Sequence, residues 1–234
     1  MERISLVPTL LVAAAVLVAA FLFWRYVWFF RNPPREVPAG NNVVSPADGT
    51  VVYVKDVGPE QEVIVIKQGM AATIKDIARE DIDSPKVLIG VFMSPLDVHY
   101  NRAPLTGKVE SIRNYPCNKE NLHMGMMHLR TLLRLEPYYK DSRHILENER
   151  TVTRIRGEHD GDEIGCYVVQ IAAKNVNCIE SYVPEGSQIG KGEIFGMIKI
   201  GSQVDTILPK RPGMRIKVRP GNKVRAGESI LVEW

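Results

Sequence analysis

The chain has little cysteine and almost no net charge. Its 234 residues include three cysteines, Cys117, Cys166 and Cys178, an odd number without the spacing of a metal site. This excludes a disulfide-rich secreted scaffold and favours a reducing compartment. A formal net charge of +3, spread over dispersed basic residues, gives no support for binding nucleic acid. We therefore expect no nucleic-acid partner and a cytoplasmic location for the folded part.

Long hydrophobic runs are absent except near the N-terminus. No charged residue occurs from Leu6 to Trp24, and these 19 residues nearly match the roughly 20 that cross a bilayer core. Aromatic residues suited to the lipid headgroup interface follow: Phe21, Phe23, Trp24, Tyr26, Trp28, Phe29 and Phe30. This pattern predicts a retained membrane anchor. The alternatives are a cleaved signal peptide, favoured by the small residues between Ala13 and Ala20, and a segment lying in the interface.

Basic residues indicate the orientation of this anchor. Those on its C-terminal side, Arg25, Arg31 and Arg35, outnumber Arg3 and the amino terminus, which Glu2 partly offsets. Since basic residues collect on the cytoplasmic side, the following domain is expected to face the cytoplasm at the cell membrane. We expect residues 1–35 to form the anchor and linker, and residues 36–234 to form one folded domain.

Beyond residue 35, short β-branched runs alternate with Gly, Pro and Asp, which predicts a mainly β domain. The expected strands are 51–54, 63–67, 87–93, 108–112, 151–155, 167–172, 177–183 and 214–218. Helical spacing predicts a short helix over 71–79. The stretch 116–148 is the least regular. In it, His123 and His128 form only a weak metal pattern, and we expect no metal.

Two segments repeat near the C-terminus. Residues 186–195 and 221–230 share the pattern Gly-x-x-(Ile/Val)-x-x-Gly-Glu, which predicts related hairpins. The pattern resembles the flat β-barrels of lipoyl and biotinyl carrier domains, and we expect a barrel or sandwich of that type. Carrier domains present a lysine in a Met-Lys hairpin. Here Lys199 follows Met197 within an apparent strand, so a carrier function is a weaker alternative.

Four motifs then occur in series. They are Ser45-Pro-Ala-Asp-Gly49, Pro95-Leu-Asp-Val-His-Tyr-Asn-Arg-Ala-Pro104, Glu147-Asn-Glu-Arg150, and Gly201-Ser202 followed by Gln203-Val-Asp205. Each alone has an ordinary explanation, such as a turn or a solvated strand edge. Together and in this order they resemble the phosphatidylserine decarboxylase family over residues 40–234. The similarity is closest to the short members, which include archaetidylserine decarboxylases.

The resemblance implies a proenzyme that cuts itself between Gly201 and Ser202. His99 would take the proton of the Ser202 hydroxyl, while Asp48 would hold the imidazole in the right tautomer. The Ser202 oxygen would attack the carbonyl of Gly201. Elimination from the resulting ester and loss of ammonia would leave a pyruvoyl group at position 202. The expected products are a large chain, 1–201, and a small chain, 202–234, paired as a heterodimer.

The same resemblance implies conversion of phosphatidylserine to phosphatidylethanolamine with release of CO2. The pyruvoyl cofactor would act as the electron sink, and His99 is the expected general acid. Longer family members often have a second histidine three residues after the first, where this chain has Arg102. Its guanidinium suits the phosphate or carboxylate of the substrate; a structural ion pair is the alternative.

Several points stay open from the sequence. Archaetidylserine is an alternative substrate, because it carries the same headgroup and differs in glycerol stereochemistry and chain linkage. A membrane-tethered carrier-like barrel and an anchored hydrolase that keeps Ser202 as its nucleophile are the other function classes. Exposed edges of a mainly β domain are compatible with a homodimer. One apolar group either admits the lipid head region or belongs to the core: Met124, Met126, Met127, Leu129, Leu132 and Leu133.

Overall fold

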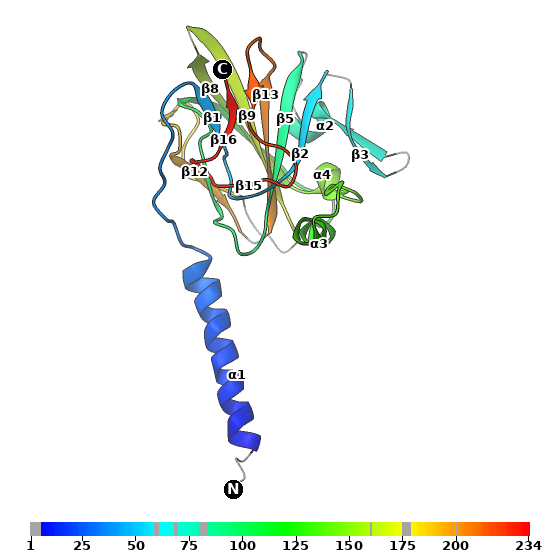
Figure 1. The fold of residues 1–234 in the computed structure, drawn as a ribbon, viewed down its shortest axis with the longest axis vertical. Coiled ribbons are helices and arrows are strands. Elements are labelled where there is room, and N and C mark those ends of the chain that lie inside the picture. The colour runs from blue at the N-terminus through cyan, green and yellow to red at the C-terminus, as the bar shows by residue number, and fades with distance from the viewer. Residues whose placement is uncertain are drawn as a thin grey trace. The chain divides into compact units, whose positions relative to one another are not determined.

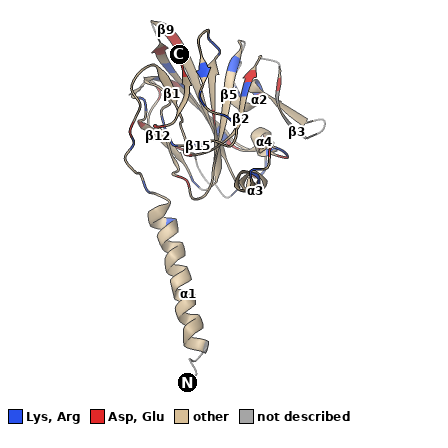
Figure 2. Ribbon diagram, in the orientation of Figure 1, with Lys and Arg blue, Asp and Glu red and all other residues tan. Residues whose placement is uncertain are grey.

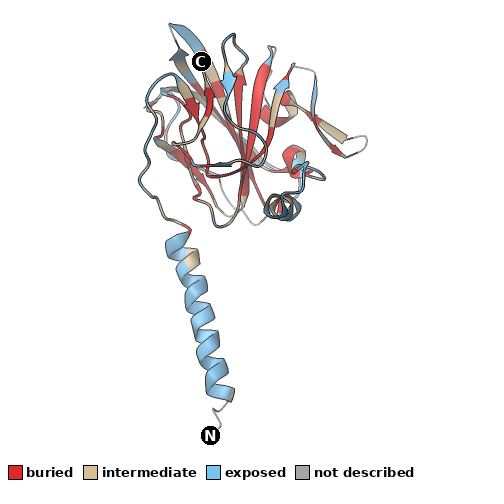
Figure 3. Ribbon diagram, in the orientation of Figure 1, coloured by how far each residue is buried: buried red, intermediate tan, exposed pale blue. Residues whose placement is uncertain are grey.

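The protein divides into two compact units, Met1–Pro33 and Pro34–Trp234. The computed structural model describes residues 6–58, 61–67, 70–79, 84–159, 161–174, 179–199 and 201–234. In the first unit, helix α1 (Leu6–Phe23) continues into a π-helical turn, η1 (Trp24–Trp28). The segment Val7–Trp28 has a mean hydropathy of 2.4 and is long enough to cross a bilayer. Its side chains are exposed along the helix (Figure 3), as expected for a membrane anchor.

The second unit is mainly β, as expected. Its largest sheet has eight antiparallel strands in the order β11-β7-β8-β9-β13-β5-β2-β15 and curves into half of a barrel (Figure 1). These strands are β2 (Gly49–Val57), β5 (Lys86–Met93), β7 (Gly107–Tyr115), β8 (Arg150–His159), β9 (Asp162–Ala172), β11 (Gln188–Ile189), β13 (Ser202–Pro209) and β15 (Lys223–Val224). Residues of both charge signs are distributed over several strands of this unit (Figure 2).

In the part of this unit that the structure describes, smaller sheets and three helices accompany the large sheet. The sheets have the orders β1-β16-β14, β10-β12-β6 and β3-β4. Their strands are β1 (Asn42–Val44), β16 (Ile230–Glu233), β14 (Arg215–Ile216), β10 (Ile179–Ser181), β12 (Ile194–Ile198), β6 (Tyr100–Arg102), β3 (Glu62–Lys67) and β4 (Met70–Thr73). The helices are α2 (Ile74–Ala78), α3 (Gly125–Leu133) and α4 (His144–Glu147).

The centre of the large sheet forms the core. Every residue of β5 is buried, and β13 beside it is buried from Ser202 to Leu208 (Figure 3). All eight expected strands overlap observed ones, although β14 keeps only two residues and positions 177 and 178 lie outside the described residues. The central strand β13 was not expected, because its polar residues have the composition of a turn.

The helix expected over 71–79 is shorter in the structure. Thr73 is the N-cap of α2: its hydroxyl accepts from the amide of Asp76, and the Asp76 carboxylate accepts from the amide of Thr73 at 2.8 Å. This capping box fixes the start of the helix, so the residues before it are free to pair as β4. The helix ends at Arg79, whose φ of 55° is left-handed.

The two repeated segments do not form hairpins, which corrects the expectation above. β11 pairs with β7 and β12 pairs with β6 and β10, whereas β15 pairs with β2 and β16 pairs with β1 and β14. The two segments resemble each other in their turns instead. Gly192 and Gly227 occupy matching positions with φ of 82° and 78°. A Cβ on Gly227 would lie 3.4 Å from the Cα of Gly192, so the two turns pack against each other.

Because Gly90 of β5 has no side chain, a residue of β2 and a residue of β13, the strands on its two sides, can hydrogen-bond to each other over it. It pairs with Tyr53 of β2 on one side and Asp205 of β13 on the other. A Cβ at this position would lie 2.4 Å from Cε2 of Tyr53 and 2.9 Å from Oδ1 of Asp205. With no side chain at Gly90, the Tyr53 hydroxyl reaches Oδ2 of Asp205 at 2.7 Å.

We expect Gly90→Ala to destabilise the domain by about 1–3 kcal/mol, the usual range for overpacking a core. The tyrosine ring is buried and hydrogen-bonded, so it cannot move aside without losing contacts. Thermal unfolding in detergent measures the effect. Gly125→Ala is the matched control, because a Cβ there meets nothing within 4 Å and alanine favours a helix. Equal midpoints for the two variants would contradict this account.

Candidate active site

Ser202 is the first residue of the central strand β13. Its side chain is fully buried, and Oγ donates to the sulfur of Met93 at 3.3 Å. Ser202 pairs with Met93 of β5 on one side and with Ala172 of β9 on the other. Gly201 before it has a φ of 56°, in the left-handed region that favours glycine. The peptide bond between them therefore lies where an unusual backbone conformation enters a rigid strand.

His99 lies at the end of the connection between β5 and β6. Residues 94–99 lead from β5 to β6, while the chain after Ile198 leads from β12 to β13. Since β5 pairs with β13 and β6 pairs with β12, both connections join the same two pairs of strands. The amide of Ile198 donates to the carbonyl of His99 at 3.4 Å. The topology thus brings the main chain of His99 against Ile198, four residues before Ser202, although about 100 residues separate the two in sequence.

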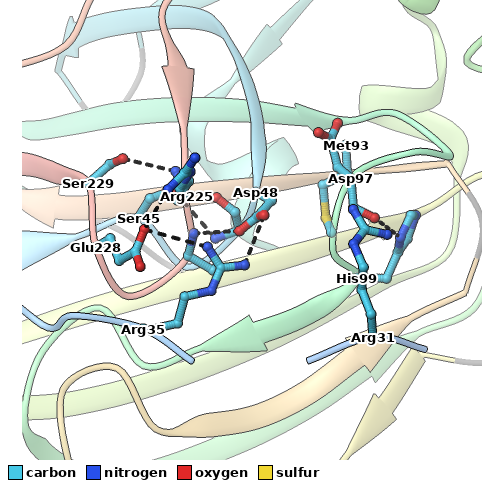
Figure 4. Close-up of polar contacts among 12 residues, drawn as sticks. Arg31, Arg35, Ser45, Asp48, Met93, Asp97, His99, Arg225, Glu228 and Ser229 are labelled. Atoms are coloured by element: carbon cyan, nitrogen blue, oxygen red, sulfur yellow. Dashed lines mark hydrogen bonds and ion pairs between the residues drawn. The ribbon is translucent and has the colours of Figure 1, made fainter. Parts of the chain in front are cut away.

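The imidazole of His99 is oriented by the main chain. The ring is buried, and Nδ1 lies 2.8 Å from the carbonyl oxygen of Asp97 (Figure 4). Because a carbonyl can only accept, Nδ1 is the protonated nitrogen, and in a neutral ring Nε2 then bears the lone pair. The Asp97 carboxylate accepts from the amide of Ser94 at 2.8 Å and fixes the turn that presents this carbonyl. A base at Nε2 is the protonation state that proton transfer from a serine requires.

Asp48 has different partners from those expected. Its Oδ2 accepts from Arg35 at 2.9 Å, and its Oδ1 accepts from the amide of Ala226 at 2.7 Å. Arg35 also lies 3.7 Å from Glu228. Figure 4 shows this ion-pair group apart from the bond between His99 and Asp97. The structure therefore does not bring Asp48 to the imidazole, and the tautomer of His99 follows from Asp97 instead.

Arg102 lies near the same ion-pair group. Its Nη1 donates to the carbonyl of Gly192 at 2.7 Å, and its amide donates to Pro46 at 2.9 Å. Burial lowers the pKa of Arg102 and the charge of Arg35 lowers it further, while Asp48 raises it. These contacts tie the Ser45–Gly49 motif to one of the repeated turns. Both hydrogen bonds are to backbone carbonyls, so neither is the ion pair of the structural alternative given above.

Two neutral polar side chains, those of Asn101 and Gln170, lie on the same side of the sheet as Ser202. The amide of Asn101 lies 3.8 Å from the same Met93 sulfur and accepts a 2.8 Å hydrogen bond from Gln170. None of these neighbours of Ser202, Met93 included, was identified as a site residue from the sequence. Asn101 lies inside one of the four motifs, two residues after His99, and that alternation in an extended segment is the signal that could have identified it.

A second polar group lies on the opposite face of β13. The hydroxyl of Tyr53 and the amide of Gln203 both donate to the carboxylate of Asp205, at 2.7 and 2.8 Å. His144 Nε2 lies 3.1 Å from the side-chain amide oxygen Oε1 of Gln203, to which it donates. All four side chains are buried. Because Gln203 is the residue after Ser202, this group holds the strand directly behind the candidate scissile bond.

Burial shifts the pKa values of Asp205 and His144 in opposite directions. It raises the pKa of Asp205 from 3.8 to about 7, against the lowering effect of hydrogen bonds from Tyr53 and Gln203. It lowers the pKa of His144 from 6.5 to about 4. Between about pH 4 and 6.5 the folded protein thus holds a proton on Asp205, whereas the unfolded chain holds one on His144. The two contributions to the pH dependence of unfolding largely cancel there.

We expect Asp205→Asn to remove this cancellation. The remaining His144 term makes the free energy of unfolding rise with pH, because only the unfolded chain binds that proton between about pH 4 and 6.5. The thermal midpoint of the variant should therefore rise between pH 4.5 and 6.5 more steeply than that of the unsubstituted protein. Asp162→Asn, whose carboxylate is 79% exposed, is the control. Parallel curves for all three proteins would mean that folded Asp205 does not retain its proton.

The Glu147–Arg150 motif forms a structural cross-link. The amide of Asn148 donates to Ala172 at 2.7 Å and to Leu122 at 2.9 Å. Since Ala172 pairs with Ser202, Asn148 supports the strand next to the candidate site. The guanidinium of Arg150 donates hydrogen bonds to backbone carbonyls, two of which belong to α2. Asn148 and Arg150 line a pocket of about 880 Å³, together with Arg79, Lys119 and Arg143.

Comparison with known proteins agrees with the motifs. A family model described as phosphatidylserine decarboxylase matches residues 22–232. A Methanopyrus kandleri protein named as an archaetidylserine decarboxylase proenzyme is 37% identical over 218 residues, with 92% of this chain and 82% of that protein covered. One of the same name from Methanocaldococcus jannaschii is 34% identical, with 93% of each covered. A phosphatidylserine decarboxylase proenzyme from Geobacter metallireducens is 32% identical, with 97% and 84% covered.

Proposed function

This chain belongs to the phosphatidylserine decarboxylase family, and we propose that it is a membrane-anchored proenzyme that cuts itself between Gly201 and Ser202. The mature enzyme would then remove CO2 from a serine phospholipid and leave an ethanolamine phospholipid. One observation carries the proposal. Gly201, with left-handed φ, leads into a buried serine at the start of the central strand, and the connection bearing His99 runs beside it.

The cleavage chemistry follows from these residues. Nε2 of His99 takes the hydroxyl proton, and Oγ of Ser202 attacks the carbonyl carbon of Gly201. The peptide C–N bond breaks as the acyl group moves to oxygen, and the serine nitrogen gains a proton. Loss of the Cα proton then expels Gly201 as a carboxylate and leaves a carbon–carbon double bond at position 202. A proton moves from the nitrogen to the terminal carbon of this double bond, which gives a methyl group and a C=N bond, and water then replaces the nitrogen, which departs as ammonia.

The surroundings of Ser202 suit the resulting pyruvoyl group. Oγ leaves with Gly201, so an uncharged methyl group replaces the hydroxymethyl side chain beside the Met93 sulfur, and the ketone oxygen takes the place of the backbone nitrogen without a buried charge. When present, the group supplies an electron sink for decarboxylation. The protein must orient the substrate beside position 202 and return a proton to carbon after CO2 leaves. His99, already beside the site, is the proposed donor of that proton.

The substrate is a phospholipid with a serine headgroup. Phosphatidylserine is the proposed substrate, and archaetidylserine is the second candidate because two relatives above are named for it. Both lipids carry the amine and carboxylate on which the chemistry acts. Assay of the purified enzyme on each lipid in the same detergent separates the two. Arg102 stays a proposed contact for the substrate phosphate or carboxylate, although its hydrogen bond to Gly192 supports a structural role.

The domain organisation is proposed on the same basis. Residues 1–35 would anchor the protein in the cell membrane, and residues 36–234 would form the decarboxylase domain on the cytoplasmic side. The matching glycine turns of the two repeats support a relation to lipoyl-type barrels. After cleavage, chains 1–201 and 202–234 would stay together, because β13 is paired on both sides by strands of the large chain. A homodimer is compatible with the exposed sheet edges.

Intact-mass analysis of the purified protein tests this proposal. We expect two chains, with the smaller beginning at position 202 and carrying a ketone in place of its amino terminus. A carbonyl-reactive hydrazide should label only that chain. An uncut chain that still decarboxylates serine lipids would overturn self-cleavage. A small chain with a free serine amine would instead indicate simple autoproteolysis.

A further inference from the structure

Helix α3 has apolar side chains on both of its faces. On the inner face, Met124 and Met127 are buried in the core. The outer face is apolar as well, and its side chains are between 44% and 70% exposed: Met126, Leu129, Leu132, Leu133 and the following Leu135. Helices at the surface of soluble domains normally turn polar residues outward. A contiguous outward apolar face of this kind is typical of a binding surface.

The charges around this face indicate which kind of partner fits it. From residue 121 to residue 135 the sequence contains Arg130 and Arg134 and no acidic residue. Basic and apolar side chains on one short helix fit the headgroup region of an anionic bilayer. A symmetric contact with a second copy would bring two sets of arginines together without acidic partners in this segment, which disfavours that occupant.

The position of α3 links this face to the reaction. The ring of His128 lies 5.9 Å from the ring of Phe92, and Phe92 pairs with Gln203, the residue after Ser202. The segment leading into the helix is joined to the neighbouring strand end, since the amide of Lys174 donates to Leu122 at 3.2 Å. The helix therefore lies at the end of the large sheet where β13 begins.

We propose that the outer face of α3 inserts into the headgroup region of an anionic phospholipid bilayer, as a second membrane contact besides the N-terminal helix. This inference rests on the proposed function for its purpose: a lipid headgroup can then reach the site at position 202 while its acyl chains stay in the bilayer. The contact itself depends only on the exposed side chains and the two arginines.

Photo-crosslinking of the full-length protein in vesicles tests the contact without using activity. The vesicles contain phosphatidylglycerol with a diazirine on the upper part of one acyl chain. After irradiation, peptide mass spectrometry should find lipid adducts on residues 126–135 as well as on the N-terminal helix, which serves as the internal positive control. Adducts confined to residues 6–28, or protein–protein crosslinks between two copies of α3, would overturn the proposal.

A double variant, Leu129→Asp with Leu132→Asp, provides the second measurement. We expect it to lose the adducts on residues 126–135 and keep those on the N-terminal helix. Its KM for serine lipid in vesicles should rise about tenfold, as for losing part of the apolar burial of two leucines, with KM for a soluble short-chain serine lipid unchanged. Ile216→Asp, at an exposed residue of β14, is the matched control. Equal KM changes on both substrates would overturn the proposal and leave the decarboxylase function intact.

Discussion

Ser202→Ala is expected to give an uncut chain of 234 residues without decarboxylase activity. Alanine has no oxygen to attack the carbonyl of Gly201, so neither the break nor the pyruvoyl group can form. Loss of an electron sink that no other side chain replaces should lower the rate by at least about 10⁶-fold, the lower end of enzymatic acceleration. A denaturing gel, intact mass and release of CO2 from a serine lipid measure the two effects.

The fold of this variant should be preserved. The Ser202 hydroxyl donates to a thioether sulfur, a weak acceptor, so its removal leaves no strong hydrogen-bonding group unsatisfied. We expect a thermal midpoint close to that of an uncut reference protein. Ser202→Cys is the matched variant, because a thiol of similar size can still attack, and it should retain slow cleavage. Normal cleavage in Ser202→Ala would exclude Ser202 as the nucleophile.

The sequence predicts the β class and the candidate scissile bond, but it does not predict the strand that holds this bond. β5 was expected because its β-branched residues form one continuous run, typical of a buried strand. β13 carries Gln203, Asp205 and Thr206, which together look like a turn. Gln203 and Asp205 are tolerated in the core because Tyr53 and His144, distant in sequence, provide hydrogen-bond partners. No local pattern contains that information.

Helix α3 was missed for a related reason. A helix is recognised in a sequence when one face is apolar and the other is polar. Here both faces are apolar, so the segment 116–148 shows no clear period. The sequence left open whether its methionines and leucines belong to the core or meet the lipid. In the structure Met124 and Met127 are buried, while Leu132 is 70% exposed.

His99→Ala is expected to slow self-cleavage by about 10²–10⁴-fold, the usual contribution of a general base. Pulse labelling followed by a denaturing gel gives the rate of conversion from the uncut to the cut chain. Since the ring of His99 is buried, a loss of stability must be separated from a loss of chemistry. His99→Gln keeps most of the volume and a donor for Asp97, so it should fold better and still cleave slowly. Normal maturation of both variants would exclude His99 as the base.

Asp48→Asn separates two roles for this carboxylate. If Asp48 held the imidazole, the variant would shift the pH dependence of cleavage, as a change in the tautomer of His99 would. In the structure Asp48 pairs instead with Arg35, whose side chain is 4% exposed. Replacing Asp48 with asparagine therefore leaves the buried charge of Arg35 with a weaker partner. We therefore expect a loss of stability of about 3 kcal/mol, as for breaking a buried ion pair, and an unchanged pH profile of cleavage.

A double-mutant cycle with Arg35→Gln gives the decisive comparison. Residues that act through one ion pair show non-additive effects, so the double variant should be little less stable than either single variant. Its cleavage should keep the same pH dependence, because the proton on Nδ1 of His99 is held by the carbonyl of Asp97 in every variant. Additive losses of stability, together with a shifted pH profile in Asp48→Asn alone, would instead mean that Asp48 reaches His99 during cleavage.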